Sequence, residues 1–428
     1  MKLFRKEYLP VVFLAAAIAL SPSFSAGEIG EGRIIEIRIE DILLVILGIL
    51  WLANFLISGR KKIEKPPLFL PILAWLGIGL FSVLVNWILG NTGISRSFFF
   101  FLKEVEFFFL YFYVFFHIKN LDAAKFFVKL WIILGFMNVG WVIYQIIRGS
   151  RFVTEFGFRS GTYGASAIGE YGPLPTGAFF LLLLIFLFNV FLYYFLNLNI
   201  SKFKKGILGI LIIGLVAGVF GSASKTSFVA MVLALFLTPL FLFLRKVNFK
   251  VISVFILAIV FMVTSLFFII ENFPKAKRLT ATFSLEGIWE NYKAGRLEVV
   301  IEPMLKESFE SSVYLPVFGL GKGHYAPEAH NQYLRNFVET GVIGSLIFFI
   351  LIFAVIKGAW HGFSKSHDGF AIGLSSGLLV ATITLLFVSF ATEAFIVVKP
   401  MEVYWFFAAL TMAVLTISKK EAFPKEKL

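Results

Sequence analysis

The sequence predicts an all-α polytopic membrane protein of about twelve transmembrane helices, with one long loop on the outer side of the membrane. Hydrophobic residues make up 59% of the 428 residues, and the mean hydropathy is +0.88. Charged residues make up only 15%, whereas soluble domains carry about 25%. We therefore expect residues 1–428 to form a single membrane domain.

Twelve segments of the chain are apolar over nearly the length of a membrane span. A helix that crosses the hydrocarbon core needs about 20 mainly apolar residues. The segments lie near 9–26, 41–57, 68–90, 98–118, 126–147, 174–198, 206–221, 227–244, 251–270, 341–356, 370–391 and 400–418. This spacing leaves one long connection, residues 271–340.

Basic residues cluster in every second connection, and this alternation predicts the orientation of the chain. The clusters lie near 2–6, 60–65, 119–125, 202–205, 245–250, 357–365 and 419–427. Lysine and arginine accumulate in cytoplasmic connections, so both termini are expected in the cytoplasm. The outer side then receives residues 27–40, 91–97, 148–173, 222–226, 271–340 and 392–399. These clusters account for the net charge of +13, and nucleic-acid binding is not expected.

The N-terminal segment allows a second interpretation. A basic start, an apolar run and the small-residue sequence SFSA at 23–26 are also typical of a cleavable signal peptide. Cleavage would leave eleven helices in the same orientation, and we favour the uncleaved form. The following sequence IIEIRIE, at 34–40, alternates apolar and charged residues. That alternation indicates a short extended or amphipathic piece at the interface.

Carboxylates are scarce in the apolar segments. Glu104 and Glu106 lie in a phenylalanine-rich stretch, where a carboxylate is unfavourable unless it is paired or hydrated. Because Lys103 is adjacent, we interpret them as lying near an interface without a chemical role. The chain has no cysteine and only three aspartates, Asp41, Asp122 and Asp368. A metal site is therefore not expected, although outer-loop glutamates leave divalent binding open.

The outer connection 271–340 is roughly 70 residues long, far beyond the usual connection of about 4 to 6. We expect it to be a large loop subdomain with short helices. The sequence LEVVIEPMLKESF predicts one helix, and PEAHNQYLRNFVETG predicts another that starts after Pro327 and stops at Gly341. His330 would then lie in the first turn of that helix.

A histidine at a helix N-terminus is suited to act as a base. The backbone N–H groups there disfavour the imidazolium cation, and neutral imidazole is the form that a general base requires. The alternative is that His330 caps the helix and hydrogen-bonds a carbonyl.

Several basic residues fall on the outer side, where the orientation rule disfavours them. Arg148, Arg151, Arg159, Lys225 and Arg296 belong to this group. Arginine pairs bidentately with phosphate, so an anionic ligand at the membrane surface, such as a lipid phosphate, would explain them. The alternative, especially for Arg148 and Arg151, is contact with lipid headgroups.

Four motifs follow one another along the chain. They are FRSGTYG at 158–164, GSASKTSFVAMV at 221–232, AGRLEVV at 294–300, and VFGLGKG at 317–323 followed by AHNQYLRNFVETGVIG at 329–344. Their order, the topology and the late outer loop together resemble the O-antigen ligase and polymerase superfamily of bacterial envelope proteins. The resemblance implies a C-type glycosyltransferase (GT-C) fold in the bacterial inner membrane, with a periplasmic active site. It also implies transfer of a glycan from an undecaprenyl diphosphate carrier.

The resemblance implies roles for individual residues. His330 matches the histidine proposed to deprotonate the acceptor hydroxyl, and Arg296 matches a diphosphate-binding arginine. Arg159 matches the arginine of the earlier outer loop. Lys225 stands where the family usually has arginine, and it keeps the charge but loses the bidentate fork. Further residues expected to support the site are His324, Asn331, Lys322, Arg335 and Glu339. No metal and no cofactor are implied.

The leading hypothesis is an O-antigen ligase of lipopolysaccharide biosynthesis, inverting and metal-independent, whose partners are the lipid-linked donor, a lipid A core acceptor and membrane lipids. An O-antigen polymerase or a protein O-oligosaccharyltransferase would have the same parts. A transporter of lipid-linked glycans is the alternative from a different class. It would place charged residues at the bilayer midplane and often has internal repeats. The sugar and the oligomeric state are not predicted.

Overall fold

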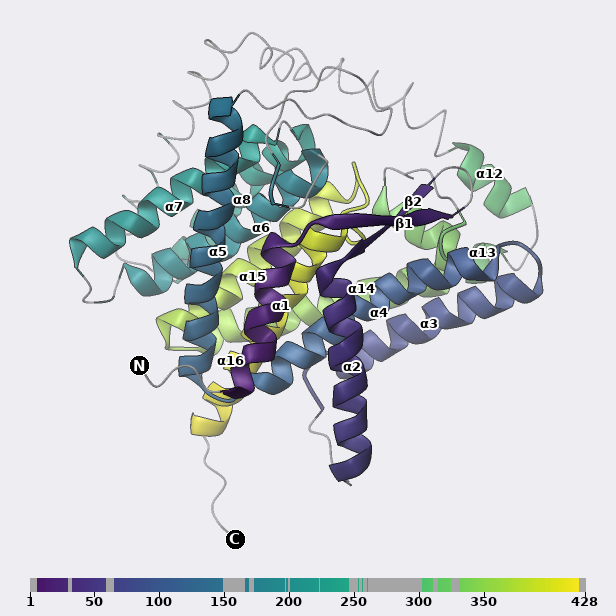
Figure 1. Cartoon of the computed structure of the whole chain (residues 1–428), viewed down its shortest axis with the longest axis horizontal. Helices are drawn as coiled ribbons and strands as arrows, with labels where there is room; N and C mark the ends of the chain where they lie inside the picture. Colours follow the sequence, from purple (N-terminus) through teal and green to yellow (C-terminus); the bar gives the residue numbers. More distant parts are fainter. Residues whose placement is uncertain are drawn as a thin grey trace.

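The structure is a computed structural model, and it describes most of the chain as a helical bundle with one small β-hairpin (Figure 1). The described residues are 6–29, 33–58, 65–148, 166–168, 173–196, 198, 201–222, 224–245, 253, 256, 260, 302–310, 315–324 and 331–422.

The elements follow the chain in a simple order. They are a 3₁₀ turn η1 (Lys6–Tyr8), α1 (Leu9–Leu20), β1 (Ser23–Ile29), β2 (Arg33–Arg38), α2 (Ile39–Ser58), α3 (Phe69–Ile88), α4 (Ile94–His117), α5 (Leu121–Arg148), α6 (Pro173–Val190), a π-helical turn η2 (Phe191–Phe195), α7 (Lys202–Gly221), α8 (Lys225–Leu244), α12 (Glu302–Glu310), α13 (Leu315–Phe318), α14 (Gln332–Lys365), α15 (Gly369–Val388) and α16 (Val398–Ala422).

Eight of the described helices are long and apolar enough to cross a membrane, which confirms the class of multi-pass membrane protein. They are α3, α5, α6 with η2, α7, α8, α14, α15 and α16. Helix α1 has only 12 residues, and α4 carries four charged residues besides its terminal histidine. The expected segment 251–270 lies mostly outside the described residues, and the total of twelve spans stays a prediction.

The N-terminal segment differs in part from the expectation. The first expected span, 9–26, is too long, because α1 ends at Leu20 and residues 23–26 belong to strand β1. The extended piece expected at 34–40 is confirmed over 34–38 as β2, which pairs antiparallel with β1, whereas Ile39 and Glu40 already belong to α2. Helix α1 packs within the bundle, where the Asn138 side chain of α5 donates to the Ala19 carbonyl at 3.1 Å. Cleavage after this segment would remove that packed helix.

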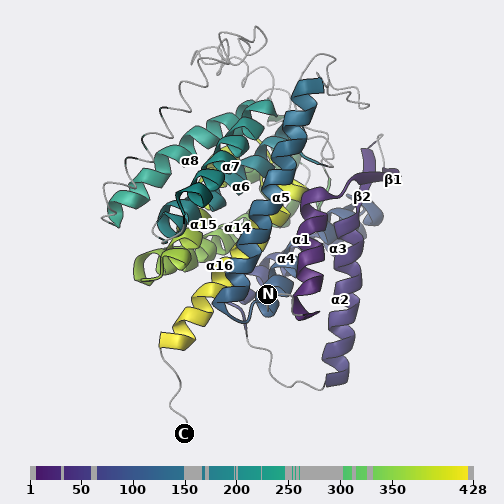
Figure 2. The same ribbon diagram turned by 60° about the vertical axis from the view of Figure 1, so that its left-hand side comes forward.

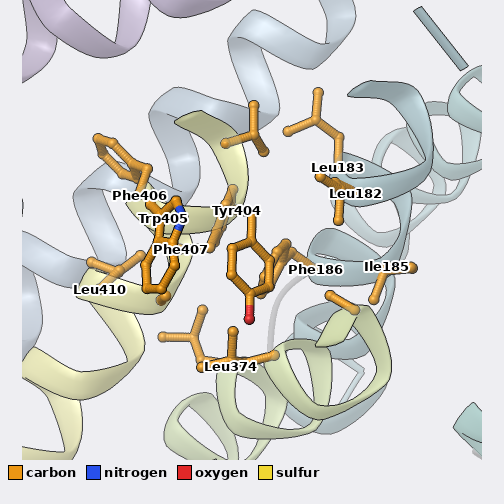
Figure 3. Close-up of a cluster of buried hydrophobic side chains, with 14 of the residues drawn as sticks. Leu182, Leu183, Ile185, Phe186, Leu374, Tyr404, Trp405, Phe406, Phe407 and Leu410 are labelled. Atoms are coloured by element: carbon orange, nitrogen blue, oxygen red, sulfur yellow. The ribbon is translucent and has the colours of Figure 1, made fainter. Parts of the chain in front are cut away.

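The centre of the bundle is formed by α6, α15 and α16. Their spans are 83%, 78% and 78% buried, whereas the α7 span is 22% buried. Figure 2 shows α16 passing between α5 and the α14–α15 pair. Aromatic rings fill the contact of α16 with α6, where Phe407 stacks on Phe186 with centroids 4.4 Å apart (Figure 3). Nearby, the Tyr404 hydroxyl lies 2.9 Å from the Thr382 hydroxyl of α15. The described core is therefore a packed interior rather than a pore.

Helix α14 is divided by a glycine kink. Gly341 has φ 68° and ψ −168°, a conformation that favours glycine, and a Cβ at this position would lie 2.1 Å from the Val317 carbonyl oxygen. The expected stop at Gly341 is thus confirmed, although a second, longer helix continues directly to Lys365.

The expected start of this helix, after Pro327, is wrong. Helix α14 begins at Gln332, and the Asn331 side chain caps it by accepting the Tyr333 and Leu334 N–H groups at 2.9 and 3.0 Å. Asparagine is a strong N-cap residue, and its cap sets the boundary. His330 therefore precedes the cap in sequence, instead of falling in the first turn.

Candidate functional site

Residues 319–324, called the glycine turn, lie against the kinked start of α14. Three of its glycines have positive φ, 78° at Gly319, 99° at Gly321 and 70° at Gly323. A Cβ at Gly319 would lie 2.3 Å from the Glu339 carbonyl carbon, and one at Gly323 would lie 2.2 Å from the Phe100 ring. The glycines of the GLGKG sequence therefore let the backbone of the turn lie close to α14 and α4, where a side chain would clash.

Hydrogen bonds fix the glycine turn to the first part of α14. The Leu320 N–H donates to the Val338 carbonyl at 2.6 Å, and the Gly321 N–H donates to the Glu339 carbonyl at 3.2 Å. The Gly323 N–H donates to the Glu339 carboxylate at 2.9 Å. Glu339 thus holds the turn through both its main chain and its side chain.

Helix α3 contributes two polar side chains to the same junction. The Ser82 hydroxyl donates to the Glu339 carbonyl at 2.6 Å, and the Asn86 amide donates to the Gly319 carbonyl at 3.0 Å. Both side chains are buried. Buried polar groups that are fully paired fix one arrangement of the surrounding segments, so this junction is held rigidly.

Five charged side chains, called the ion-pair network, connect α4, the glycine turn, α14 and the segment before α16. Lys322 Nζ lies 2.6 Å from Glu104 Oε1 and 3.7 Å from Glu339 Oε2. Arg335 contacts Glu339 at 2.9 Å and Glu393 at 2.5 Å. The lysine and arginine side chains are only 1% and 2% exposed.

Aromatic rings complete the enclosure of the two cations. The Lys322 ammonium lies 4.5 Å from the centroid of the Trp75 ring, and the Arg335 guanidinium lies 5.5 Å from that of Phe100. Such contacts stabilise desolvated cations. Both cationic groups are thus paired and covered, and neither is exposed for direct contact with a ligand.

An apolar groove of about 410 Å³ begins at the N-terminus of α14. Its lining residues are Leu305, Asn331, Tyr333, Leu334, Phe337, Phe349 and Phe390. The Tyr333 hydroxyl donates to the Leu386 carbonyl at 2.6 Å. This hydrogen bond satisfies the polar end of Tyr333, and its aromatic ring lines the groove. The groove is wide open, and its lining is almost entirely apolar.

Only part of the site predicted from the sequence lies in the described residues. His330, Arg296 and Arg159 are outside them. Asn331, the residue after His330, caps α14 and lines the apolar groove. His324 ends the glycine turn, where its carbonyl accepts a hydrogen bond from the Arg96 guanidinium at 3.1 Å.

Lys225 is the first residue of α8 and is exposed. The Ser224 side chain caps that helix and accepts the Ser227 N–H at 3.2 Å. The N-terminus of a helix favours anions through its dipole and unpaired N–H groups. Lys225 therefore has a local environment compatible with a negatively charged group.

The structure adds a partner for Glu104 that the sequence does not predict. Glu104 pairs with Lys322 and not with its neighbour Lys103, because successive residues of a helix point about 100° apart. A carboxylate in an apolar segment requires a partner, so the sequence does indicate that Glu104 is paired, but it does not indicate with which residue. The ion pair between Glu393 and Arg335 is also not predictable from the sequence, because nothing in the short connection that contains Glu393 indicates such a pairing.

No protein-family profile matches the chain, and no curated protein sequence matches it at a significant level. The fold and the buried charge pairs define a multi-pass, helical membrane protein with a rigidly held junction beside an apolar groove. The activity is accordingly a proposal, based on this junction and on the sequence motifs.

Proposed function

We propose that this protein is a membrane glycosyltransferase of the O-antigen ligase type, which transfers a glycan from undecaprenyl diphosphate to lipid A core. One observation carries the proposal: Asn331, from the His-Asn motif, caps α14 at the edge of an apolar groove. An apolar groove lined by Asn331, the residue that follows the proposed base in the sequence, suits a donor that combines a prenyl chain with a polar head. The resemblance to the O-antigen ligase superfamily supports the same conclusion.

The proposed transfer is a single displacement. His330 accepts the proton of the acceptor hydroxyl, and the hydroxyl oxygen forms a bond to the anomeric carbon of the donor sugar. The bond from that carbon to the diphosphate oxygen breaks, and its electron pair leaves with undecaprenyl diphosphate. The configuration inverts, and no covalent intermediate forms. A positioned base contributes about 10² to 10⁴ in rate.

Arg296, Arg159 and Lys225 are proposed to hold the diphosphate. Fixed positive charges stabilise negative charge as it develops on a leaving group, so no metal is required for this step. The exposed N-terminal position of Lys225 on α8 supports an anion-binding role. Arginine would grip the phosphate through two parallel hydrogen bonds, whereas this lysine acts as a point charge.

The ion-pair network is proposed to position the catalytic segment. Arg335 and Glu339 lie within the first turns of α14, and both connect it to neighbouring segments. A small displacement of a reacting group reduces the rate strongly, so a rigid support beneath Asn331 favours catalysis. Lys322, His324 and Asn331 contribute to the same support.

The location of the reaction follows from the basic clusters. We propose that the protein lies in the bacterial inner membrane with both termini in the cytoplasm. The loop 271–340, and with it the catalytic segment, then faces the periplasm. Lipid-linked glycans and the lipid A core would meet the enzyme on that side.

Reconstitution with defined substrates tests the function. Purified protein in liposomes receives one undecaprenyl-diphosphate-linked glycan and, in separate reactions, lipid A core, a second lipid-linked repeat or a peptide with serine and threonine. Transfer to lipid A core with release of undecaprenyl diphosphate is expected. Transfer only to the second repeat would identify a polymerase, and transfer only to the peptide an oligosaccharyltransferase.

A lipid-linked glycan transporter is the second candidate. It is favoured by the buried charged residues inside the helical bundle, such as Glu104 on α4 and Glu402 on α16, because charges in membrane helices often mark transport pathways. Movement of the intact donor across the liposome membrane, with no undecaprenyl diphosphate released in any reaction, would establish this candidate instead.

A further inference from the structure

Three carboxylates from three separate helices meet inside the described bundle. Asp41 of α2, Glu106 of α4 and Glu402 of α16, called the carboxylate triad, each offer an oxygen within 4.8 Å of the others. A point equidistant from three oxygens that are 4.8 Å apart lies 4.8/√3, or about 2.8 Å, from each of them. This is close to the Ca²⁺–oxygen distance of about 2.3 to 2.6 Å, so one cation at that point requires only a small inward shift of the oxygens.

Glu402 is the clearest indication that a ligand belongs here. Its side chain is fully buried, at 0% exposure, and neither carboxylate oxygen has a hydrogen-bond partner among the described residues. Asp41 and Glu106 each have one carboxylate oxygen that receives no N–H or O–H donor, but their two carboxyl groups lie close enough to share a hydrogen bond with each other. Burying an ionised carboxylate without a partner is strongly unfavourable, so this group requires compensation.

Lys103 compensates the triad only in part. Its ammonium lies 2.6 Å from Asp41 Oδ2 and 3.1 Å from Glu106 Oε2, and these are the partnered oxygens of the two residues. No such ion pair reaches Glu402 among the described residues. One lysine for three carboxylates leaves an excess of negative charge, which a divalent cation would neutralise.

The other nearby cations, Arg38 and Lys399, form their ion pair or hydrogen bond with groups other than Glu402. Glu40 accepts a hydrogen bond from the Ser21 hydroxyl and lies 3.9 Å from the Arg38 guanidinium. The Lys399 ammonium donates to the Ile168 carbonyl. Arg38 and Lys399 both act on Glu40. The charge of Arg38 also acts on Glu402, but neither cation forms a hydrogen bond with the Glu402 oxygens.

The triad is separate from the ion-pair network, although both use α4. Glu104 and Glu106 are two residues apart, and so they point about 200° apart around the helix. Glu104 faces Lys322 of the glycine turn, whereas Glu106 faces Asp41 of α2 and Glu402 of α16. The triad therefore has no part in the proposed transfer reaction.

We propose that the carboxylate triad is a divalent-cation site, with Ca²⁺ as the best match, that ties α2, α4 and α16 together. A set of carboxylate oxygens selects hard cations such as Ca²⁺, Mg²⁺ or Mn²⁺ over Zn²⁺. Separations near the 4.8 Å limit suit the longer Ca²⁺–oxygen distance better than Mg²⁺, which holds its oxygens at about 2.0 to 2.1 Å. Asp41 is the third residue of α2, directly after β2, so the ion would also anchor the base of the β-hairpin.

Direct binding to the full-length protein tests the proposal. Protein purified in detergent and stripped with a chelator is titrated with Ca²⁺ and, separately, Mg²⁺ by calorimetry, and its melting temperature is recorded. Saturable Ca²⁺ binding at one site per chain and a higher melting temperature are expected. Glu402→Gln keeps the shape and removes a ligand charge, and should weaken Ca²⁺ binding at least about 100-fold, since even outer-shell partners are worth about 10- to 100-fold.

The matched control is Glu421→Gln, on the exposed end of the same helix, and it should bind Ca²⁺ as the unchanged protein does. If Glu402→Gln fails to fold, the proposal is tested instead by weaker Ca²⁺ binding of Glu106→Gln and by a stoichiometry of one Ca²⁺ per chain for the unchanged protein. The proposal is overturned if the unchanged protein binds neither ion and melts at the same temperature with and without chelator. The triad would then be neutralised by protons. Undiminished binding by the folded Glu402→Gln variant would overturn it equally.

Discussion

Lys322 and Glu104 form a 2.6 Å ion pair between positions 218 residues apart in the chain. The pair joins the glycine turn to the middle of α4, and both side chains are buried. Removing one partner leaves the other as an uncompensated buried charge, which usually destabilises a protein by about 3 to 5 kcal/mol.

We therefore expect Lys322→Met to lower the free energy of unfolding by about that amount, 3 to 5 kcal/mol. Unfolding of the purified protein in detergent, followed by circular dichroism, measures it. The control is Lys306→Met, since Lys306 and Glu310 form an exposed pair at 3.9 Å; its effect should stay below about 1 kcal/mol. Equal effects of the two substitutions would contradict the structural role of Lys322.

The kink of α14 predicts a second pair of variants. Gly341→Ala should destabilise the protein by about 1 to 3 kcal/mol, because Gly341 has φ 68° and its new Cβ would meet the Val317 carbonyl. Gly77→Ala, in α3, meets no atom within 4 Å and should stabilise by about 0.5 to 1 kcal/mol. A comparison of the two melting temperatures checks this, and a tolerated Gly341→Ala would show that the kink is dispensable.

The Asn331 cap predicts an effect on activity beyond stability. Asn331→Ala should lose about 0.5 to 2 kcal/mol of stability and lower kcat for transfer, with the donor KM nearly unchanged, because the catalytic segment shifts while the groove remains. Asn331→Asp keeps the cap and should restore kcat. Ser201→Ala removes the cap of α7 and should leave kcat unaltered. If both cap losses reduce kcat alike, Asn331 has no positioning role.

The topology predicts which residues an impermeant thiol reagent reaches. The chain has no cysteine, so a single introduced cysteine reports its own side of the membrane. Ser95 and Ser364 are both exposed serines, on connections expected outside and inside. In spheroplasts, Ser95→Cys should be labelled by a membrane-impermeant maleimide, and Ser364→Cys only after permeabilisation. The reverse pattern would invert the proposed orientation.

The helices of the bundle were largely predictable from the sequence. The expected segments 370–391 and 400–418 correspond to α15 (Gly369–Val388) and α16 (Val398–Ala422). Such agreement arises because the length of a span and its apolar composition are both local properties. The sequence predicts β2 only as an extended piece without a partner, because the apolar run that precedes β1 predicts a helix through residue 26.

The contacts of the site were less predictable, because they depend on tertiary structure. Glu104 and Lys322 are far apart in the sequence, and no local pattern links them. The sequence offers both Pro327 and Asn331 as signals near the start of α14, and only the structure shows that Asn331 supplies the cap. The meeting of Glu106 and Glu402 likewise depends on how α4 packs against α16.

The central claim is tested most directly by transfer in liposomes with His330→Ala. The unchanged protein should move glycan from undecaprenyl diphosphate to lipid A core and release undecaprenyl diphosphate. His330→Ala should lose transfer while it still folds and binds the donor. His361→Ala, an exposed position near the other end of α14, should transfer normally. Full transfer by His330→Ala would contradict the account.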